Sequence, residues 1–192
     1  MLKTIFNQKE KEFLLKLARE ALKEYLETGK IRQVQKSKVE YSRLLEERGC
    51  FVTLNRWDGD LRGCIGHILP VQPLYQDVIE NALAAGTRDP RFAPVSLDEL
   101  AGLKIEISVL SIPQELKYKD MTDLLKKLKP GRDGVIVEKG WRQATFLPQV
   151  WEVLPDKEEF LRHLCLKAGL PGTTWQEGGL KVKIYRAEVF NE

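Results

Sequence analysis

The chain contains few of the residues that build metal centres or disulfide frameworks. Its 192 residues include only 2 histidines and 3 cysteines, which are Cys50, Cys64 and Cys165. Three cysteines cannot all pair within one chain, and none of them belongs to a CxxC motif. These absences argue against a disulfide scaffold and against a structural zinc site. We therefore expect no bound metal and a reducing, cytoplasmic compartment.

Two further absences concern membranes and nucleic acids. No apolar run approaches the ~20 residues needed to span a bilayer, and the first residues lack the long apolar segment of a signal peptide. The 31 basic and 28 acidic residues leave a formal net charge of +3. That balance does not by itself indicate a nucleic-acid-binding protein. A chain of 192 residues fits one domain, or two small lobes that share a core.

The most informative stretch is Leu61–Gly66, which we predict to be the second strand of a β-hairpin after Cys50–Trp57. Asp58-Gly59 separates the two strands and favours a two-residue type I′ turn, because both central residues of that turn need φ > 0. This turn predicts the cross-strand pairs Trp57 with Asp60, Asn55 with Arg62, Thr53 with Cys64, and Phe51 with Gly66.

Side chains alternate between the two faces of a strand, so this register sorts the hairpin into two faces. The apolar face carries Cys50, Val52, Leu54, Leu61, Ile65 and His67. The polar face carries Phe51, Thr53, Asn55, Arg62, Cys64 and Gly66. Arg62 is then beside Cys64, and a neighbouring cation favours the reactive thiolate. His67 points to the opposite face, which leaves Cys64 without an adjacent base.

The glycines and the cysteine of this strand allow two interpretations. Gly63 and Gly66 lack side chains and would let a ligand approach the strand closely. Glycines in strands also mark bulges or tight packing, and a single strand cysteine is more often inert than reactive. Both interpretations stay open at this point.

Apolar periodicity predicts a long first helix over residues 8–28, which begins at a capping box of Asn7 and Glu10 and ends at Gly29. The same reasoning predicts helices through 78–84, 120–129 and 157–168, and strands at 104–111, 135–138, 141–146 and 181–190. Strands joined mostly by hairpins, with helices between others, indicate an α+β fold with an antiparallel sheet.

Arg88 and Arg91 lie on a predicted loop around Asp89-Pro90. Two arginines on one loop can bind a carboxylate or a phosphate as a fork. The alternative is that Asp89 pairs with one of them while Phe92 anchors the loop in the core.

Two acid–base candidates lie further along the chain. Glu106, on a predicted strand, is a candidate general base or acid if burial raises its pKa, although pairing with an arginine is the usual role of such a residue. His163 lies off the apolar face of its helix and four residues beyond Glu159. It is a surface histidine or a base that a neighbouring lobe covers, whereas Cys165 lies on the apolar face.

Leu61-Arg62-Gly63-Cys64-Ile65-Gly66 resembles the signature of the AMMECR family. Other segments resemble family segments in the same order, namely Arg88–Phe92, Glu106–Ser111, Gly134–Gly140, Phe146–Trp151 and Phe160–Leu170. The resemblance runs from about Phe13 to Phe190. The residues after Phe160 lean towards the prokaryotic members, which are called AmmeMemoRadiSam system protein A.

This resemblance implies one domain over residues 1–192, made of two lobes that each have an antiparallel sheet. The larger lobe would hold both chain ends, and the signature would lie near the junction of the lobes. The resemblance also implies cytosolic or nuclear residence, no cofactor of its own, and association with a Memo-like protein and a radical SAM protein. It supplies no defined reaction.

Three functional hypotheses follow. In the first, the protein is an enzyme or an enzyme component, in which Cys64 is a nucleophile or acceptor thiol activated by Arg62. Arg88 and Arg91 would then hold an anionic substrate, and Glu106 or His163 would transfer protons. In the second, Gly63, Gly66 and the arginine loop form a groove in a non-catalytic adaptor. The third is a translation-linked nucleic-acid-binding role, suggested by a pI near 8.7 but supported by no RNA- or DNA-binding motif.

Overall fold

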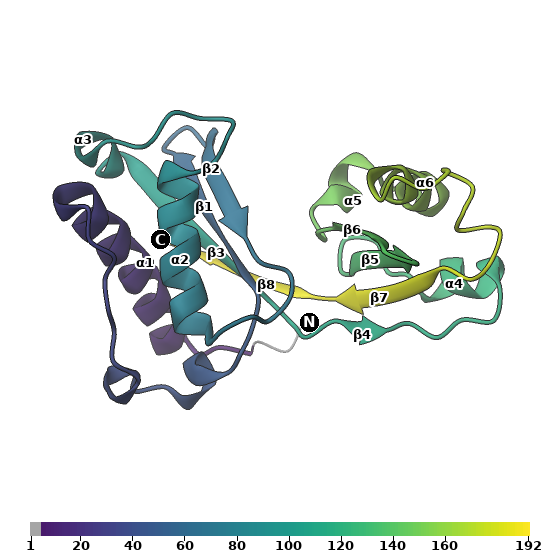
Figure 1. The fold of residues 1–192 in the computed structure, drawn as a ribbon, viewed down its shortest axis with the longest axis horizontal. Helices are drawn as coiled ribbons and strands as arrows, with labels where there is room; N and C mark the ends of the chain where they lie inside the picture. Colours follow the sequence, from purple (N-terminus) through teal and green to yellow (C-terminus); the bar gives the residue numbers. More distant parts are fainter. Residues whose placement is uncertain (1–4) are drawn as a thin grey trace. The chain divides into compact units, whose positions relative to one another are not determined.

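The computed structural model describes residues 5–192, which divide into two compact units (Figure 1). Unit 1 comprises the residues up to Leu110 together with Glu188–Glu192, and unit 2 comprises Ser111–Ala187. Each unit contains an antiparallel, four-stranded sheet with flanking helices. The predicted α+β class is therefore confirmed.

The elements of unit 1 are α1 (Gln8–Thr28), the 3-10 helices η1 (Lys36–Lys38) and η2 (Ser42–Leu45), β1 (Cys50–Arg56), β2 (Leu61–Gly66), α2 (Leu74–Thr87), α3 (Leu97–Leu100), β3 (Leu103–Leu110) and β8 (Ala187–Asn191). The elements of unit 2 are β4 (Gln114–Glu115), α4 (Met121–Lys127), β5 (Gly134–Lys139), β6 (Arg142–Phe146), α5 (Val150–Val153), α6 (Lys157–Lys167) and β7 (Lys181–Tyr185).

Local signals determine both ends of α1. The Asn7 side chain accepts a hydrogen bond from the Glu10 backbone, and the Glu10 carboxylate accepts one from the Asn7 backbone, so the predicted capping box is present. Gly29 ends the helix in the left-handed region with φ 70°, which a residue without a side chain adopts readily. The 21 residues of α1 would be long enough to span a bilayer, but the helix is amphipathic. No helix within residues 5–192 combines the length and hydropathy of a bilayer-spanning segment.

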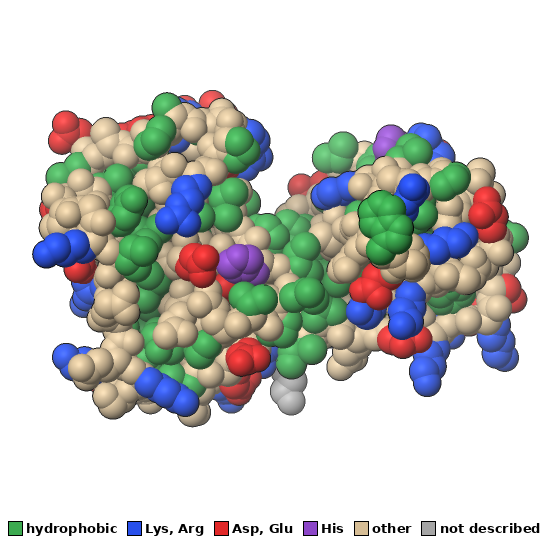
Figure 2. Space-filling view, in the orientation of Figure 1, with side chains coloured by type: hydrophobic (Ala, Val, Ile, Leu, Met, Phe, Trp, Pro, Cys, Tyr) green, Lys and Arg blue, Asp and Glu red, His purple; other side chains and the backbone are tan. Residues whose placement is uncertain are grey.

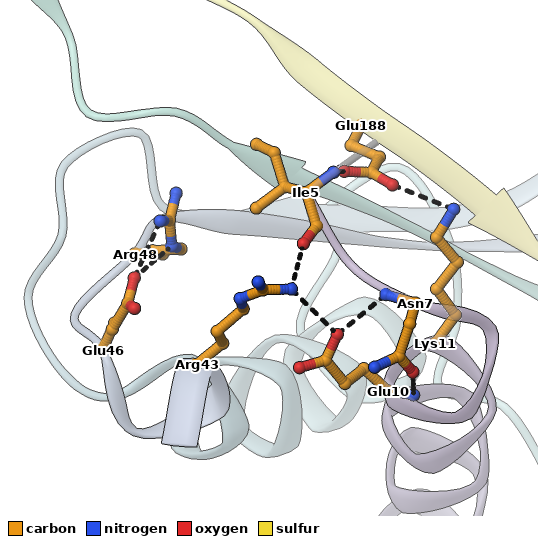
Figure 3. Close-up of polar contacts among 8 residues, drawn as sticks. All are labelled: Ile5, Asn7, Glu10, Lys11, Arg43, Glu46, Arg48 and Glu188. Carbon is orange, nitrogen blue, oxygen red and sulfur yellow. Dashed lines mark hydrogen bonds and ion pairs between the residues drawn. The ribbon is translucent and has the colours of Figure 1, made fainter. Parts of the chain in front are cut away.

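Polar contacts fasten the first described residues to the last strand (Figure 3). The Glu188 carboxylate of β8 accepts a hydrogen bond from the Ile5 backbone N–H at 2.7 Å and pairs with Lys11 at 2.9 Å. Arg43 donates to the Ile5 carbonyl at 2.8 Å and lies 3.6 Å from the Glu10 carboxylate. These contacts hold the start of α1 against both β8 and η2.

The unit 1 sheet has the strand order β2-β1-β3-β8, and α1 and α2 pack on one of its faces (Figure 1). Val52, Leu54, Ile105 and Ile107 are completely buried and point towards these helices. Side chains at the intervening positions point to the opposite face, which we call the outer face. The hydrophobic core of unit 1 therefore lies between the sheet and the two helices.

The turn of the β1–β2 hairpin differs from the prediction. Among the described residues only glycines have positive φ, so Asp58 cannot occupy the first central position of a type I′ turn. Gly59 N–H donates to the Arg56 carbonyl at 3.0 Å, and Arg56 N–H donates to the Asp60 carbonyl at 2.8 Å. This is a three-residue loop with Gly59 at φ 95°. The Asp58 carboxylate stabilises the loop by accepting the Asp60 N–H at 3.1 Å.

The predicted strand 181–190 is in fact two strands in two sheets. β7 pairs with β5 and β4 in unit 2, whereas β8 pairs with β3 in unit 1. The break falls at Arg186, whose backbone N–H donates to the Ser111 hydroxyl at 2.9 Å. Apolar residues alternate on both sides of Arg186, so the sequence pattern does not reveal that the chain passes from one sheet to the other there.

Unit 2 has its own core between its sheet and α6. The Trp151 ring stacks on Phe160 with a centroid distance of 3.6 Å. The indole N–H of Trp151 donates to the Asp133 carbonyl at 2.7 Å, which satisfies a buried donor. Cys165 is completely buried in this core, as its place on the apolar face of its helix predicted.

Candidate functional site

Three polar side chains form a row across the outer face of the unit 1 sheet. Cys64 on β2 lies opposite Thr53 on β1, and Thr53 lies opposite Glu106 on β3. The Thr53 hydroxyl donates a hydrogen bond to Cys64 Sγ at 3.2 Å. All three residues are partly exposed. The strand register therefore brings a thiol, a hydroxyl and a carboxyl group together on one accessible surface.

The environment of Glu106 suits acid–base chemistry. Partial burial raises the pKa of its carboxyl group, because a charge is less stable where water is excluded. A hydrogen bond from Asn191 on β8 opposes this effect by stabilising the ionised form. A carboxyl group with a raised pKa is closer to the range in which general acids and bases work at neutral pH. The half-buried position that the alternation predicted for Glu106 is confirmed.

Asp89 holds the backbone at Cys64. β2 is an edge strand, and its Cys64 N–H donates to Asp89 Oδ2 at 2.8 Å. Arg91 binds the same carboxylate through Nε at 2.9 Å and Nη2 at 2.6 Å, and its Nη2 also donates to the Cys64 carbonyl at 3.3 Å. The hydrogen bonds from Arg91 hold the pKa of Asp89 far below its usual range. Of the two interpretations of this loop, the structure shows the second, in which Asp89 pairs with one of the two arginines, Arg91.

Arg62 does not occupy its predicted position. Leu54 lies opposite Gly63 but Asn55 lies opposite Leu61, so the predicted Asn55–Arg62 pair is wrong and Arg62 is the extra residue of a bulge. Its guanidinium pairs with Glu99 at 2.5 Å and donates to the Ala93 carbonyl at 2.9 Å, and Arg62 as a whole is 5% exposed. This pairing lowers the pKa of Glu99. Because its charge is neutralised there, Arg62 is not positioned to activate Cys64.

Arg88 and Arg91 do not form a common fork. Arg91 is occupied by Asp89, whereas the exposed Arg88 lines a groove beside α2. The structure thus gives the two residues different contacts, and the fork was one of the two alternatives left open by the sequence.

His163 belongs to α6 of unit 2. Its Nε2 lies 3.0 Å from an Arg162 nitrogen and 3.7 Å from the Glu159 carboxylate, and its side chain is 42% exposed. These are the contacts of a histidine on the surface of a helix. The row on the outer face of unit 1 is built without it.

His67 was expected to point away from Cys64, and its contacts are on the α2 side of the sheet. Its Nδ1 lies 2.6 Å from Oδ1 of Asp77, a completely buried residue of α2. The other Asp77 oxygen accepts the Cys50 N–H at 2.9 Å. Asp77 was missed by the sequence analysis, because an acidic residue in an amphipathic helix usually lies on the solvated face. Here it joins the helix to the start of β1.

The two glycines of β2 serve packing within unit 1. A Cβ at Gly63 would lie 2.2 Å from the Ala85 carbonyl oxygen of α2, and a Cβ at Gly66 would lie 2.3 Å from the Phe51 ring. Their missing side chains thus allow the helix and the Phe51 ring to approach β2. Of the two interpretations of these glycines, the geometry favours tight packing.

Among residues 5–192, no three His, Cys, Asp or Glu side chains are grouped so that they could hold a metal ion. The row itself supplies one thiol, one hydroxyl and one carboxyl group. Thiols can act as nucleophiles, and carboxyl groups can act as general acids or bases.

Comparison with known proteins identifies the family. The family model described as AMMECR1 matches residues 15–190. The chain belongs to the AMMECR1 family. Among archaeal AMMECR1 relatives, Protein MK0488 from Methanopyrus kandleri is 43% identical, over 95% of this chain and 88% of its own. Protein PF1979 from Pyrococcus furiosus is 45% identical, over 94% of this chain and 87% of its own.

A solved structure has the same fold. The crystal structure of the uncharacterized protein PH0010 from Pyrococcus horikoshii matches with a TM-score of 0.82 and 44% sequence identity, covering 94% of this chain and 90% of that chain. The AMMECR1 match includes the β1–β2 hairpin, Asp89 and Glu106. The family inferred from Leu61–Gly66 and the later segments is confirmed.

We predict that Gly63→Ala destabilises unit 1 by about 1–3 kcal/mol, because α2 must move away from β2 to accommodate the methyl group. Urea unfolding followed by circular dichroism measures this change. Gly102→Ala is the matched control, since its Cβ would meet nothing closer than 3.5 Å. Equal stabilities of the two variants would contradict the close helix–strand contact.

We predict that Glu106→Gln raises the free energy of unfolding at pH 7 but leaves it unchanged near pH 3. A raised pKa means that the folded protein loses stability as pH rises above the unfolded value of about 4.3, and the loss persists above the folded pKa. Glutamine carries no such penalty. Urea titrations at both pH values test this, with the exposed Glu115→Gln as control. A variant that is less stable than wild type at pH 7 would contradict the assignment.

Proposed function

We propose that Cys64 is the working group of this AMMECR1 protein and acts as a nucleophile or acceptor thiol, with Glu106 as the acid–base group. The observation that carries the proposal is that Cys50 and Cys165 are completely buried, whereas Cys64 is partly exposed in a row with Thr53 and Glu106. Three neighbouring strands of one sheet hold this row, so its geometry is rigid.

The proposed chemistry is group transfer to sulfur. Because β1 separates Cys64 from Glu106, the proton passes through Thr53, whose hydroxyl rotates to accept the thiol proton and to give its own proton to ionised Glu106. The thiolate then forms a bond to an electrophilic carbon of the substrate. The bond from that carbon to its leaving group breaks, and protonated Glu106 returns the proton to the leaving group. The Thr53 hydrogen bond at 3.2 Å orients the sulfur for this step.

We further propose that the protein works as a component of an AmmeMemoRadiSam modification system, together with a Memo-like protein and a radical SAM protein. Membership of the AMMECR1 family supports this proposal. Any radical chemistry would belong to the radical SAM partner, and this chain would supply the thiol. Cytoplasmic residence is part of the same proposal.

The two other hypotheses receive less support. The adaptor hypothesis placed a groove at Gly63, Gly66 and the arginine loop, but these residues mainly make contacts within unit 1. A nucleic-acid-binding surface needs a concentration of basic residues. Figure 2 instead shows basic and acidic side chains interspersed on the visible faces of both units.

We predict that iodoacetamide alkylates one cysteine of the native protein and that this cysteine is Cys64. The sulfur atoms of Cys50 and Cys165 are enclosed in the two cores, where the reagent cannot reach them. Intact-mass spectrometry should show one adduct in the native protein, none in native Cys64→Ser, and three adducts in the urea-unfolded wild type. A native protein that resists alkylation would refute the reactive-thiol proposal.

A second experiment separates the enzyme from the adaptor. Tagged wild type, Cys64→Ser and Glu106→Gln are co-expressed with the Memo-like and radical SAM proteins of the same organism, and captured partners and covalent adducts are identified by mass spectrometry. The proposal predicts that all three capture the partners but that only wild type carries a substrate adduct in full yield. Capture without an adduct in any form would favour the adaptor, and no capture would contradict the modification-system assignment.

A further inference from the structure

A groove on the helix side of unit 1 lies apart from the Cys64 row. One wall is residues 31–34. The other wall is one side of α2 together with Gln72, which precedes the helix, and Arg88, which follows it. Its volume is about 270 Å³. Ile31 and Val34 supply its accessible apolar surface, because the lining residues Ile79 and Leu83 are only 5% and 3% exposed. This volume is just below the range of ~300–1,000 Å³ typical of small-molecule pockets, which limits any ligand of the groove to a small one.

Arg88 is distinctive among the arginines of unit 1. Seven others form an ion pair with a carboxylate, namely Arg19, Arg32, Arg43, Arg48, Arg56, Arg62 and Arg91. The exposed Arg88 makes no side-chain hydrogen bond and no ion pair with any residue in the described range 5–192. A guanidinium group has five donors suited to a carboxylate or phosphate. The groove therefore has an unoccupied anion-binding group at one end.

The other charged groups of the groove already have partners. Arg32 pairs with Glu20 at 2.8 Å and with Glu24 at 3.0 Å. Glu80 accepts a hydrogen bond from the Gln72 amide at 2.7 Å. Glu80 and Arg88 are eight residues apart, which corresponds to about 12 Å along a helix. The negative charge of Glu80 is therefore remote from the anion position at Arg88.

We propose that this groove binds a small amphipathic anion, whose carboxylate or phosphate group pairs with Arg88 and whose hydrocarbon part covers Ile31 and Val34. The site goes beyond the proposed function, because its residues lie on the α2 side of the sheet and Cys64 lies on the outer face. The apolar lining selects the body of the ligand, and Arg88 selects the sign of its head group.

Isothermal titration calorimetry with octanoate as the probe tests the head-group contact. Replacing a charge-assisted bidentate pair should weaken binding by about tenfold or more, so we expect this loss in Arg88→Gln. Arg186→Gln is the matched control, because Arg186 is an exposed arginine of unit 2 whose side chain forms no ion pair among the described residues. Equal weakening in both variants, or no saturable binding to wild type, would overturn the proposal.

Two further comparisons test the rest of the site. Octyl phosphate against octanoate shows which head group is preferred, and tighter binding of octylammonium than of both would refute an anion site. Ile31 is 49% exposed, so Ile31→Ser should weaken octanoate binding without unfolding the protein. Ile112→Ser, at a position that is 58% exposed and outside the groove, should not. Binding that is unchanged in Ile31→Ser would contradict the apolar contact.

Discussion

The carboxylate of Asp89 takes the place that a further strand would occupy at the edge of the unit 1 sheet. An edge strand exposes backbone groups that have no partner in a neighbouring strand. Asp89 accepts the Cys64 N–H at 2.8 Å, and Arg91, itself bound to Asp89, donates to the Cys64 carbonyl. This pairing fixes the backbone of β2 at Cys64. Because side chains alternate along a strand, it also fixes the thiol on the outer face beside Thr53.

Most residues of β2 make contacts that stabilise unit 1, whereas the Cys64 thiol is left partly exposed. Arg62 forms an ion pair with Glu99 of α3 and donates to the Ala93 carbonyl, so the edge of the sheet is bound both to α3 and to the loop after α2. Gly63 and Gly66 allow close approach of α2 and of the Phe51 ring. Cys64 is the residue whose functional group these contacts leave available. Arg62, Gly63 and Gly66 therefore make structural contacts, and together with Asp89 they hold Cys64 in a fixed position on the strand.

Local patterns predicted the helices and the hairpin because their signals lie within a few residues of each other, as in the capping box of α1 and Gly29. The pairing of Thr53 with Cys64 was correct for a less direct reason. The loop is one residue longer than the predicted turn, and the bulge at Arg62 adds one residue on the opposite strand, so the two differences cancel. The partner of Arg62, the buried Asp77 and the change of sheet at Arg186 depend on contacts between distant residues, for which one sequence carries no signal.

Amide hydrogen exchange at Cys64, followed by NMR, tests the central claim most directly. In wild type the Cys64 amide should be strongly protected although it lies on an edge strand, because Asp89 is its acceptor. In Asp89→Ala its protection should fall at least tenfold more than that of Ile65, which lies opposite Val52 in β1. Unchanged protection of the Cys64 amide in Asp89→Ala would contradict the account, because the thiol would then be positioned without this carboxylate.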